Sequence, residues 1–367
     1  MRLTFKQIKD EISKIVPRSI EYSVELEAGN IAIVTPEPLK FGGGDGLVGK
    51  IAKKVKRKIK IRPDQSIMKS EIDAKSIIES IIPEEADLTQ IYFDGCFCEV
   101  IIQCKNPGEA VGKRGANVQQ IREQTGWIPI VERTPPIFSK TVHDIRGYRN
   151  ANSEERRKLL KDFGLNMHRP TRPGQVWARV TALGSYREVG RACHFVTTNE
   201  SRVMIDVGVN IASVTDPMPF FTAPEAMPLE KIDAVILTHS HLDHAGMLPV
   251  LFKYGYRGPV YCTPPTRDLM LLLQSDYIKV SGAEGRSPAY DMEDIRTCMK
   301  HVVDVNWGET TDISPDIKLT FSNAGHILGS SAVHLHIGEG KHNLVFSGDQ
   351  KYEKSWLFDA ANTRFPK

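Results

Sequence analysis

The hydrophobic and polar positions of the first 135 residues repeat one order of elements twice. In the first copy, apolar residues at helical spacing are followed by two strand-like runs joined by a turn at Gly29. The elements of this copy are a helix carrying Phe5, Ile8, Ile12 and Ile15, strands over 20–26 and 31–35, a glycine-rich stretch over 42–46, a basic helix and a short strand over 59–61. This pattern predicts a small α+β module.

The second copy has the same order and ends before a proline pair. Its elements are a helix over 72–82, strands over 90–93 and 97–104, the loop Gly112-Lys113-Arg114-Gly115, a helix through Val118, Ile121 and Gln124, and a strand over 127–131. The predicted order is α-β-β-α-α-β in both copies. With a G-x-x-G loop between two helices, it resembles the type II KH domain, whose loop clamps the backbone of single-stranded nucleic acid.

The chemistry of this loop suits a phosphate group. Glycines at 112 and 115 let a phosphate approach the main chain, and the helix that follows presents free N–H groups. Lys113 and Arg114 add positive charge. We therefore predict that Gly112, Lys113, Arg114 and Gly115 bind RNA, with a purely structural turn as the alternative.

The first copy departs from the KH pattern, because Ile51-Ala52 stands where the second glycine is expected. A loop in a shifted register, Gly46-Leu47-Val48-Gly49, is a possible substitute. The segment 50–62 holds eight Lys or Arg residues and no acid, which predicts a positive surface. We expect this degenerate module to contribute charge to RNA binding, and a solvated amphipathic helix is the alternative. The residues expected to do so are Lys53, Lys54, Lys56 and Arg57.

Residues 136–174 are polar and rich in arginine, which predicts a helical connector. Beyond Val176, short apolar strands punctuated by glycine alternate with helices, as in a sandwich of mixed sheets covered by helices. We predict an α+β and α/β multidomain chain. Its parts are a degenerate KH-like module over 1–65, a KH module over 66–135, the connector over 136–174 and the sandwich over 175–367.

Composition narrows the class of protein. The chain has 367 residues, 41% hydrophobic and 25% charged, which is typical of several folded domains. Six cysteines without a C-x-x-C pair indicate reduced thiols, and a net charge of +3 says little about partners. No long apolar run and no signal-peptide core is present, so we expect a cytoplasmic protein.

Four apolar strands of the last region each run into residues that commonly bind metals. They lead to Asp206, to the motif His239-Ser240-His241-Leu242-Asp243-His244, to His326 and to Asp349. Strands that end at one sheet edge bring such groups together, and histidines two apart on an extended segment point the same way. Histidine and carboxylate ligands without thiolate suit zinc, and also manganese or iron. A solvated histidine-rich loop is the alternative.

Residues 175–367 resemble the metallo-β-lactamase fold and, within it, the β-CASP branch of nucleases. The resemblance implies that His239, His241 and His326 hold one zinc ion, that Asp243 and His244 hold a second, and that Asp349 bridges the two. It implies that Asp206 orients a ligand, and it makes Asp206 and Asp243 the expected catalytic carboxylates. A hydroxide between the two ions would then hydrolyse phosphodiesters.

Tandem KH-like modules ahead of this fold, together with Asn323-Ala324-Gly325-His326, resemble the archaeal homologues of the cleavage and polyadenylation specificity factor. That resemblance implies an RNA endonuclease, in some members also a 5′-to-3′ exonuclease, which trims transcript 3′ ends and promotes transcription termination. It also implies single-stranded RNA and RNA polymerase as partners, and a possible homodimer.

In that family a β-CASP domain interrupts the hydrolase half, whereas this sequence ends at Lys367, before that region. We therefore expect a truncated record or a split gene product whose β-CASP half associates in trans, with the second metal site incomplete. The alternative function is an RNA-binding scaffold that is inactive without such a partner. A hydrolase of small esters or thioesters is disfavoured, because a small substrate would not need the basic KH-like half.

Overall fold

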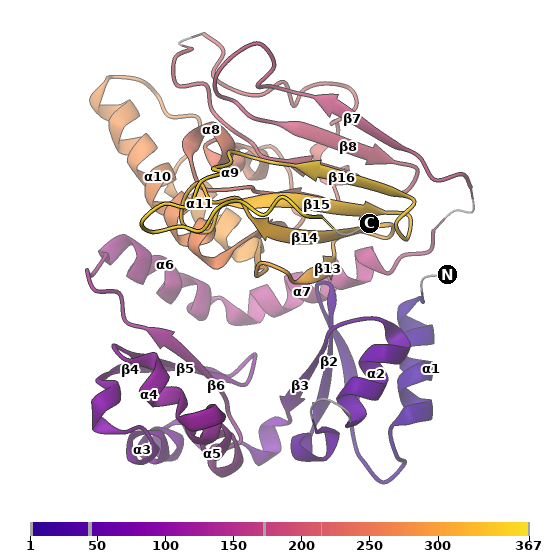
Figure 1. Ribbon diagram of the computed structural model, residues 1–367, viewed down its shortest axis with the longest axis vertical. Coiled ribbons are helices and arrows are strands. Elements are labelled where there is room, and N and C mark those ends of the chain that lie inside the picture. Colours follow the sequence, from indigo (N-terminus) through magenta and orange to yellow (C-terminus); the bar gives the residue numbers. More distant parts are fainter. Residues whose placement is uncertain (1–2, 43–45, 172–173, 214, 366–367) are drawn as a thin grey trace. The chain divides into compact units, whose positions relative to one another are not determined.

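The computed structural model describes residues 3–42, 46–171, 174–213 and 215–365. The chain forms two compact units, residues 1–161 and 162–367, whose elements are shown in Figure 1. Within the described residues, no helix is both long enough and apolar enough to cross a membrane.

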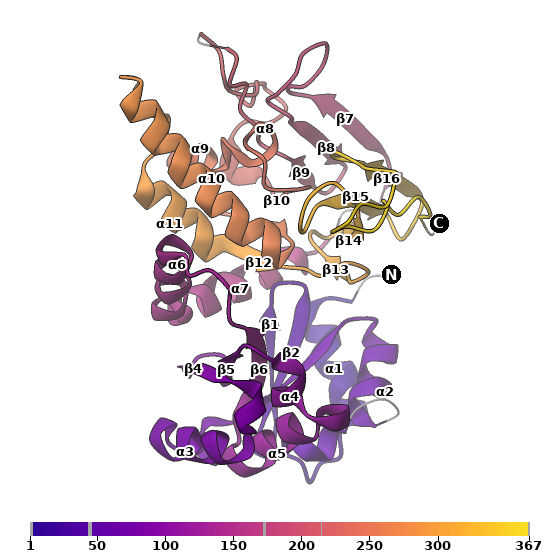
Figure 2. The same cartoon turned by 60° about the vertical axis from the view of Figure 1, so that its left-hand side comes forward.

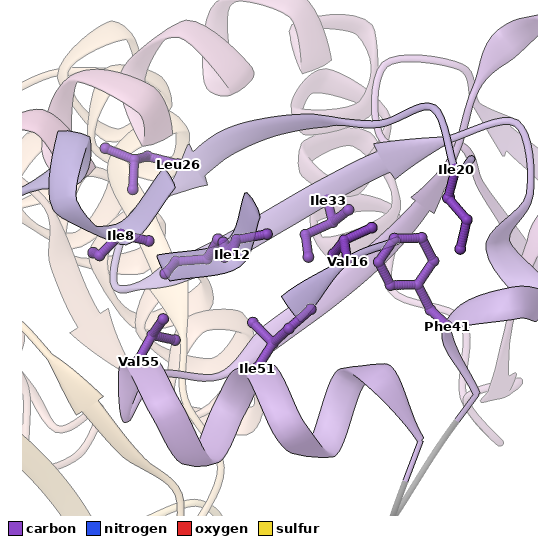
Figure 3. Packing of buried hydrophobic residues seen from close by; sticks show 10 residues of the cluster. Ile8, Ile12, Val16, Ile20, Leu26, Ile33, Phe41, Ile51 and Val55 are labelled. Carbon is purple, nitrogen blue, oxygen red and sulfur yellow. The ribbon is translucent and has the colours of Figure 1, made fainter. Parts of the chain in front are cut away.

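The first copy of the repeat folds as an α+β module. Its elements are α1 (Phe5–Ile15), β1 (Ser23–Glu27), β2 (Asn30–Thr35), the 3₁₀ turns Pro38–Phe41 and Gln65–Ile67, α2 (Leu47–Val55) and β3 (Ile59–Pro63). Strand β2 lies in the centre of the sheet, antiparallel to β1 and parallel to β3. Thr4 and Gln7 form a capping box that fixes the start of α1. Ile8 and Ile12 of α1 pack with Ile51 of α2 against the sheet, as Figure 3 shows.

The second copy repeats this topology. Its elements are α3 (Glu71–Ile81), the 3₁₀ turn Glu84–Ala86, β4 (Leu88–Asp94), β5 (Glu99–Cys104), α4 (Pro107–Val111), the 3₁₀ turn Lys113–Gly115, α5 (Ala116–Thr125) and β6 (Ile128–Arg133). Strand β5 lies in the centre, antiparallel to β4 and parallel to β6. Its buried core includes Ile78, Val100, Ile121 and Trp127. The predicted α-β-β-α-α-β order is present here in full.

The first copy has a 3₁₀ turn, Pro38–Phe41, where the second copy has α4. The prediction that Gly46–Gly49 forms the glycine loop in a shifted register is wrong. Gly46 is the N-cap of α2 and Gly49 lies inside that helix. Gly42 ends the 3₁₀ turn with φ 54° and ψ 167°, close to the φ 75° and ψ 171° of Gly112. Gly42 therefore takes the place of Gly112 in the first copy, and residues 43–45, which follow it, lie outside the described part of the chain.

The end of the basic segment is not at the surface. Arg62 is buried, and its guanidinium donates hydrogen bonds to Glu27 of the first copy and to Glu99 and the Phe97 carbonyl of the second. The prediction that the whole segment 50–62 forms a positive surface is therefore wrong at Arg62. Its partner Glu27 lies 35 residues away in the sequence, which the local charge pattern could not reveal.

The predicted connector contains two helices, α6 (Lys140–Ala151) and α7 (Ser153–Met167). Residues of α7 up to 161 belong to the first unit. There, Arg157 donates to the Cys96 carbonyl at 3.1 Å and to Glu25 Oε2 at 2.7 Å, so that it joins the two copies of the repeat. This part of α7 therefore holds the two modules together.

The second unit contains two sheets with helices on one side, as Figure 2 shows for α9, α10 and α11. The six-stranded sheet has the order β12-β11-β10-β9-β8-β7, and the four-stranded antiparallel sheet has the order β13-β14-β15-β16. Strands β9 to β12 are parallel, and β10 and β11 are buried throughout, as expected for parallel strands covered on both faces.

The bounds of these elements agree with the predicted mixed sandwich. They are β7 (Ala178–Ala182), β8 (His194–Thr198), β9 (Arg202–Ile205), the 3₁₀ turn Leu229–Lys231, β10 (Ala234–Ile236), α8 (Leu242–Ala245), α9 (Leu248–Lys253), β11 (Val260–Cys262), α10 (Pro264–Ala283), α11 (Met292–His301), β12 (Val302–Asp304), β13 (Thr310–Asp312), β14 (Ile317–Asn323), β15 (Ser331–Ile337) and β16 (His342–Phe346).

Candidate metal centre

The predicted ligand residues follow the ends of four strands in the second unit. Asp206 directly follows β9, and the histidine motif begins three residues after β10. His326 and Asp349 follow β14 and β16 of the other sheet at the same spacing. The two sheets therefore both contribute to one site, as the strand pattern predicted.

Three histidines converge with one carboxylate oxygen. His241 Nδ1 lies 3.1 Å from His239 Nε2 and 3.2 Å from His326 Nε2. Asp349 Oδ2 lies 3.4 Å from His326 Nε2 and 3.9 Å from His239 Nε2, and the four ligand atoms all lie within 4.8 Å of one another. A tetrahedral ion with bonds of about 2.0–2.1 Å holds its ligand atoms about 3.3 Å apart. The spacing of the four atoms fits such an ion.

The other oxygen of Asp349 faces a second group. Asp349 Oδ1 lies 3.3 Å from His244 Nε2, and Asp243 Oδ2 lies 3.9 Å from the same nitrogen. One carboxylate thus has an oxygen on each side, which is the arrangement of a bridging ligand. This second group offers three ligand atoms, from Asp243, His244 and Asp349.

Asp206 supports the centre from behind. Its backbone is left-handed, with φ 61°. Its Oδ2 accepts from Thr238 Oγ1 and lies 2.8 Å from His244 Nδ1, and its Oδ1 accepts from the Thr238 N–H at 2.8 Å. A carboxylate at Nδ1 fixes the tautomer that leaves Nε2 free to bind a cation. Asp206 is therefore placed to orient His244 rather than to bind a metal itself.

Electrostatics at the centre favours a cation. Burial lowers the pKa of His239 to about 3, which keeps its imidazole neutral and able to bind a metal. Burial opposes the charging of His244 too, but the carboxylate of Asp206 outweighs it and raises the pKa of His244 to about 10. The hydrogen bond with His244 lowers the pKa of Asp349 to about 2. Without a metal, His244 therefore carries a positive charge between Asp206 and Asp349, and a cation bound at its Nε2 would take the place of a proton.

Sequence reasoning assigned no role to two residues that shape this centre. Thr238 contacts Asp206 and lies 3.0 Å from His239 Nδ1 through its hydroxyl, and the Ser330 hydroxyl accepts from the His326 N–H at 3.1 Å. The sequence did offer a signal for Thr238, because its hydroxyl side chain directly precedes the first histidine of the motif, His239. Gly348 has φ 55°, and a Cβ there would lie 2.7 Å from Thr238 Cβ, so a glycine is needed beside the ligand Asp349.

The predicted RNA-binding loop of the second copy is exposed. Lys113 and Arg114 lie at the surface, and Gly112, Arg114 and Gly115 all have positive φ. A Cβ at Gly112 would lie 2.8 Å from the Asn117 side chain. Gly115 caps α5 without a side-chain hydrogen bond, so no capping side chain occupies the start of that helix.

The predicted residues of the first copy lie on or beside α2. Lys53, Lys54 and Lys56 are exposed, and Lys54 Nζ lies 3.2 Å from Glu11 Oε2. Arg57 is half-buried and donates to the Lys56 carbonyl at 2.8 Å.

Comparison with known proteins places these features in a family. Residues 195–364 match the metallo-β-lactamase superfamily domain, and residues 2–68 match the KH domain of transcription termination factor FttA. Transcription termination factor FttA of Methanosarcina mazei is 48% identical over 361 residues, and that of Methanothermobacter thermautotrophicus is 45% identical over 365. These matches cover 98% and 99% of this chain.

The chain belongs to the FttA family. It corresponds to the N-terminal part, because it spans 57% of the length of each of these two FttA relatives. It has an N-terminal KH domain and part of a metallo-β-lactamase fold with a histidine and aspartate cluster able to hold a metal. A solved metallo-β-lactamase from Cronobacter sakazakii, a HARLDQ motif mutant, is 18% identical over 47% of this chain and 64% of its own, with a TM-score of 0.33, too low to add to this assignment.

Proposed function

We propose that the chain is the RNA-binding and metal-binding part of a ribonuclease that processes transcript 3′ ends and promotes transcription termination. The observation that carries the proposal is the convergence of His239, His241, His326 and Asp349 within 4.8 Å. The FttA relatives bear the name of transcription termination factors, which supports the cellular role.

Two zinc ions fit the donor set. His239, His241 and His326 would hold the first, Asp243 and His244 the second, and Asp349 both. When bound, zinc supplies Lewis acidity and a nucleophile at neutral pH, which is the chemistry that phosphodiester hydrolysis needs. Asp206 orients His244 through Nδ1, and Asp243, whose Oδ2 lies 3.9 Å from Nε2 of His244, is the second proposed catalytic carboxylate. The ligand set of the second ion has three members among the described residues.

RNA would be held by the glycine loop of the second copy. Gly112 and Gly115 let a phosphate approach the main chain, and the exposed Lys113 and Arg114 supply charge. The second copy would thus act as a KH domain, and the first copy would add positive charge through Lys53, Lys54, Lys56 and Arg57. Such a protein would act on single-stranded RNA in the cytoplasm, beside RNA polymerase and as a possible homodimer.

A second candidate is an RNA-binding scaffold that cuts only with a β-CASP half in trans. It is favoured by the second ligand group, which offers three ligand atoms among the described residues, from Asp243, His244 and Asp349. In this case the chain binds RNA and metal but leaves RNA intact by itself. The ribonuclease of the first candidate function would act as an endonuclease, as a 5′-to-3′ exonuclease, or as both.

The deciding experiment pairs metal content with RNA cleavage. We expect the wild-type chain to bind zinc and the His241→Ala variant to lose most of its zinc content. The reason is that His241 Nδ1 lies close to the ligand nitrogens of both His239 and His326. RNA labelled at either end should be cut by the zinc-loaded chain and spared by His241→Ala or after chelation. Zinc binding without cleavage supports the scaffold, whereas a chain that binds no zinc refutes both candidates.

A further inference from the structure

The long helix α10 contacts the segments that carry both groups of ligand residues. It begins at Pro264, shortly after β11, and it packs against the short helix α8, as Figures 1 and 2 show. Helix α8 carries Asp243 and His244 of the second ligand group. The loop 326–330 begins at His326 of the first group. Buried polar side chains of α10 and its N-cap bind the main chain of both segments.

The first of these contacts joins the start of α10 to the carbonyl of Gly329. Thr263 Oγ1 donates to that oxygen at 2.8 Å, and Thr266 Oγ1 donates to it at 3.1 Å. Thr263 is the N-cap of α10, and both threonines are buried. A Cβ at Gly329, whose φ is 80°, would lie 2.6 Å from Thr263 Oγ1 and 2.9 Å from the Thr266 nitrogen. Glycine therefore lets the loop approach closely enough for both hydrogen bonds.

The carbonyl of Gly329 belongs to a tight loop that begins at the ligand His326. Ser330 Oγ accepts from the His326 N–H at 3.1 Å and from the Ile327 N–H at 3.2 Å. The Ser330 N–H donates to the Ile327 carbonyl at 3.0 Å, and Ser330 is fully buried. Ser330 thus joins the two ends of the loop. A fixed carbonyl at Gly329 therefore also fixes the main chain of His326.

The second contact lies further along α10 and involves Gln274. Its Nε2 donates to the Ala245 carbonyl at 2.8 Å, and its side chain is fully buried. Ala245 is the last residue of α8 and directly follows the ligand His244. The three preceding carbonyls of α8 accept main-chain N–H groups, at Leu242 from Val209, at Asp243 from Ala192 and at His244 from Val207. Gln274 therefore completes the anchoring of the helix that carries the second ligand group.

The chemistry of these contacts indicates more than packing. A buried hydroxyl or amide costs free energy unless it forms a hydrogen bond, and valine or methionine would fill similar space without that cost. Thr266 and Gln274 both use buried donors on carbonyls of ligand segments. Because both lie in one helix, helix geometry sets their separation along the axis at about 12 Å.

We propose that Thr266 and Gln274 are positioning residues, which hold the two ligand groups at a fixed separation through α10. This inference rests on the proposed binding of two zinc ions. Thr266 fixes the segment of the first group, and Gln274 fixes that of the second. Asp349 contacts histidines of both groups through different oxygens, so it can serve both ions only when the two segments keep their places.

The test follows zinc binding to each group separately in the chelator-treated full chain. Two-dimensional NMR of nitrogen-15-labelled histidines resolves the groups, because the ring nitrogens of His326 and His244 shift when their own ion binds. Thr266→Val removes a hydroxyl without changing the shape of the side chain, and it should weaken zinc binding at His326 about tenfold, with little change at His244. Gln274→Met should do the reverse. Thr266→Ser keeps the hydroxyl and should restore the wild-type affinity.

The matched control is Thr198→Val in the turn between β8 and β9. Thr198 is buried, and its Oγ1 accepts from the Ser201 N–H at 2.9 Å, in a turn that carries no proposed ligand. This variant should lose stability but keep both zinc affinities. Thermal melting of each metal-free variant shows that it is folded at the temperature of the titration. If Thr266→Val is not folded, Thr266→Ala takes its place.

The outcomes separate the positioning role from the proposed function. Zinc affinities of Thr266→Val and Gln274→Met equal to those of Thr198→Val overturn the positioning role and leave the proposed function standing. Equal weakening at both groups in every variant also overturns it, because general loss of stability then explains the change. If the two variants weaken different groups but the zinc-loaded wild type leaves RNA intact, the ribonuclease fails and the positioning role stands. A wild type that binds no zinc overturns both.

Discussion

Replacing Arg62 by methionine should strongly destabilise the first unit. Arg62 is 4% exposed and Glu27 is 5% exposed, and the guanidinium donates to both oxygens of that carboxylate. Without Arg62, Glu27 keeps only the ion pair with Lys60 Nζ at 3.1 Å. Breaking a buried ion pair by removing one partner costs about 3–5 kcal/mol, because the remaining charge stays buried.

Urea unfolding followed by Trp127 fluorescence measures this loss, since Trp127 is buried in the first unit. With an urea dependence of about 2 kcal/mol per molar, the midpoint should fall by roughly 1.5–2.5 M. Lys105→Met is the control, because the Lys105–Asp87 pair is half-exposed or more on both sides and should contribute less than about 1 kcal/mol. Adding Glu27→Leu to Arg62→Met should recover part of the loss. A midpoint for Arg62→Met equal to that of Lys105→Met would refute the reasoning.

Three further changes test the electrostatics and the metal centre. Asp206→Asn should weaken binding of the second zinc about 10–100-fold, because His244 loses its orienting carboxylate, and zinc titration showing two unchanged sites would contradict this. Gly348→Ala should lower zinc content in the purified protein, since its Cβ would collide with Thr238; full occupancy would show that the loop can move aside. Arg62 lowers the pKa of Glu27 against the effect of burial, so this carboxylate stabilises the fold above its unfolded pKa, and the effect is lost as the pH falls below about 4.5. The difference in unfolding free energy between wild type and Glu27→Gln should therefore shrink from pH 7 to about pH 4, and a constant difference would argue against a lowered pKa.

Residues whose role depends on local pattern could be predicted from the sequence. Helical spacing located α1, and strand ends located His239, His326 and Asp349, because a strand that ends at a sheet edge fixes where the next residues lie. The burial of Arg62 could not be predicted, because Glu27 and Glu99 reach it only through tertiary structure.

The glycine loop of the first copy shows the same limit. Several glycines there allow more than one register, and only the backbone angles of Gly42 identify the one adopted. Likewise, the positive φ of Asp206 arises where β9 turns toward the centre. Aspartate adopts positive φ more often than most residues, but this propensity does not show which aspartate of the chain does so.

The position of the metal centre at the meeting of the two sheets couples cation binding to folding. His239 and His244 follow a strand of the six-stranded sheet, whereas His326 and Asp349 follow strands of the four-stranded sheet. An ion held by both groups is a cross-link that exists only when the two sheets are assembled. At a free concentration 100 times its Kd, such an ion adds about 2.7 kcal/mol to the stability of the assembled unit. The thermal stability of the second unit should therefore rise with zinc concentration, and a bound cation would then stabilise the sandwich itself.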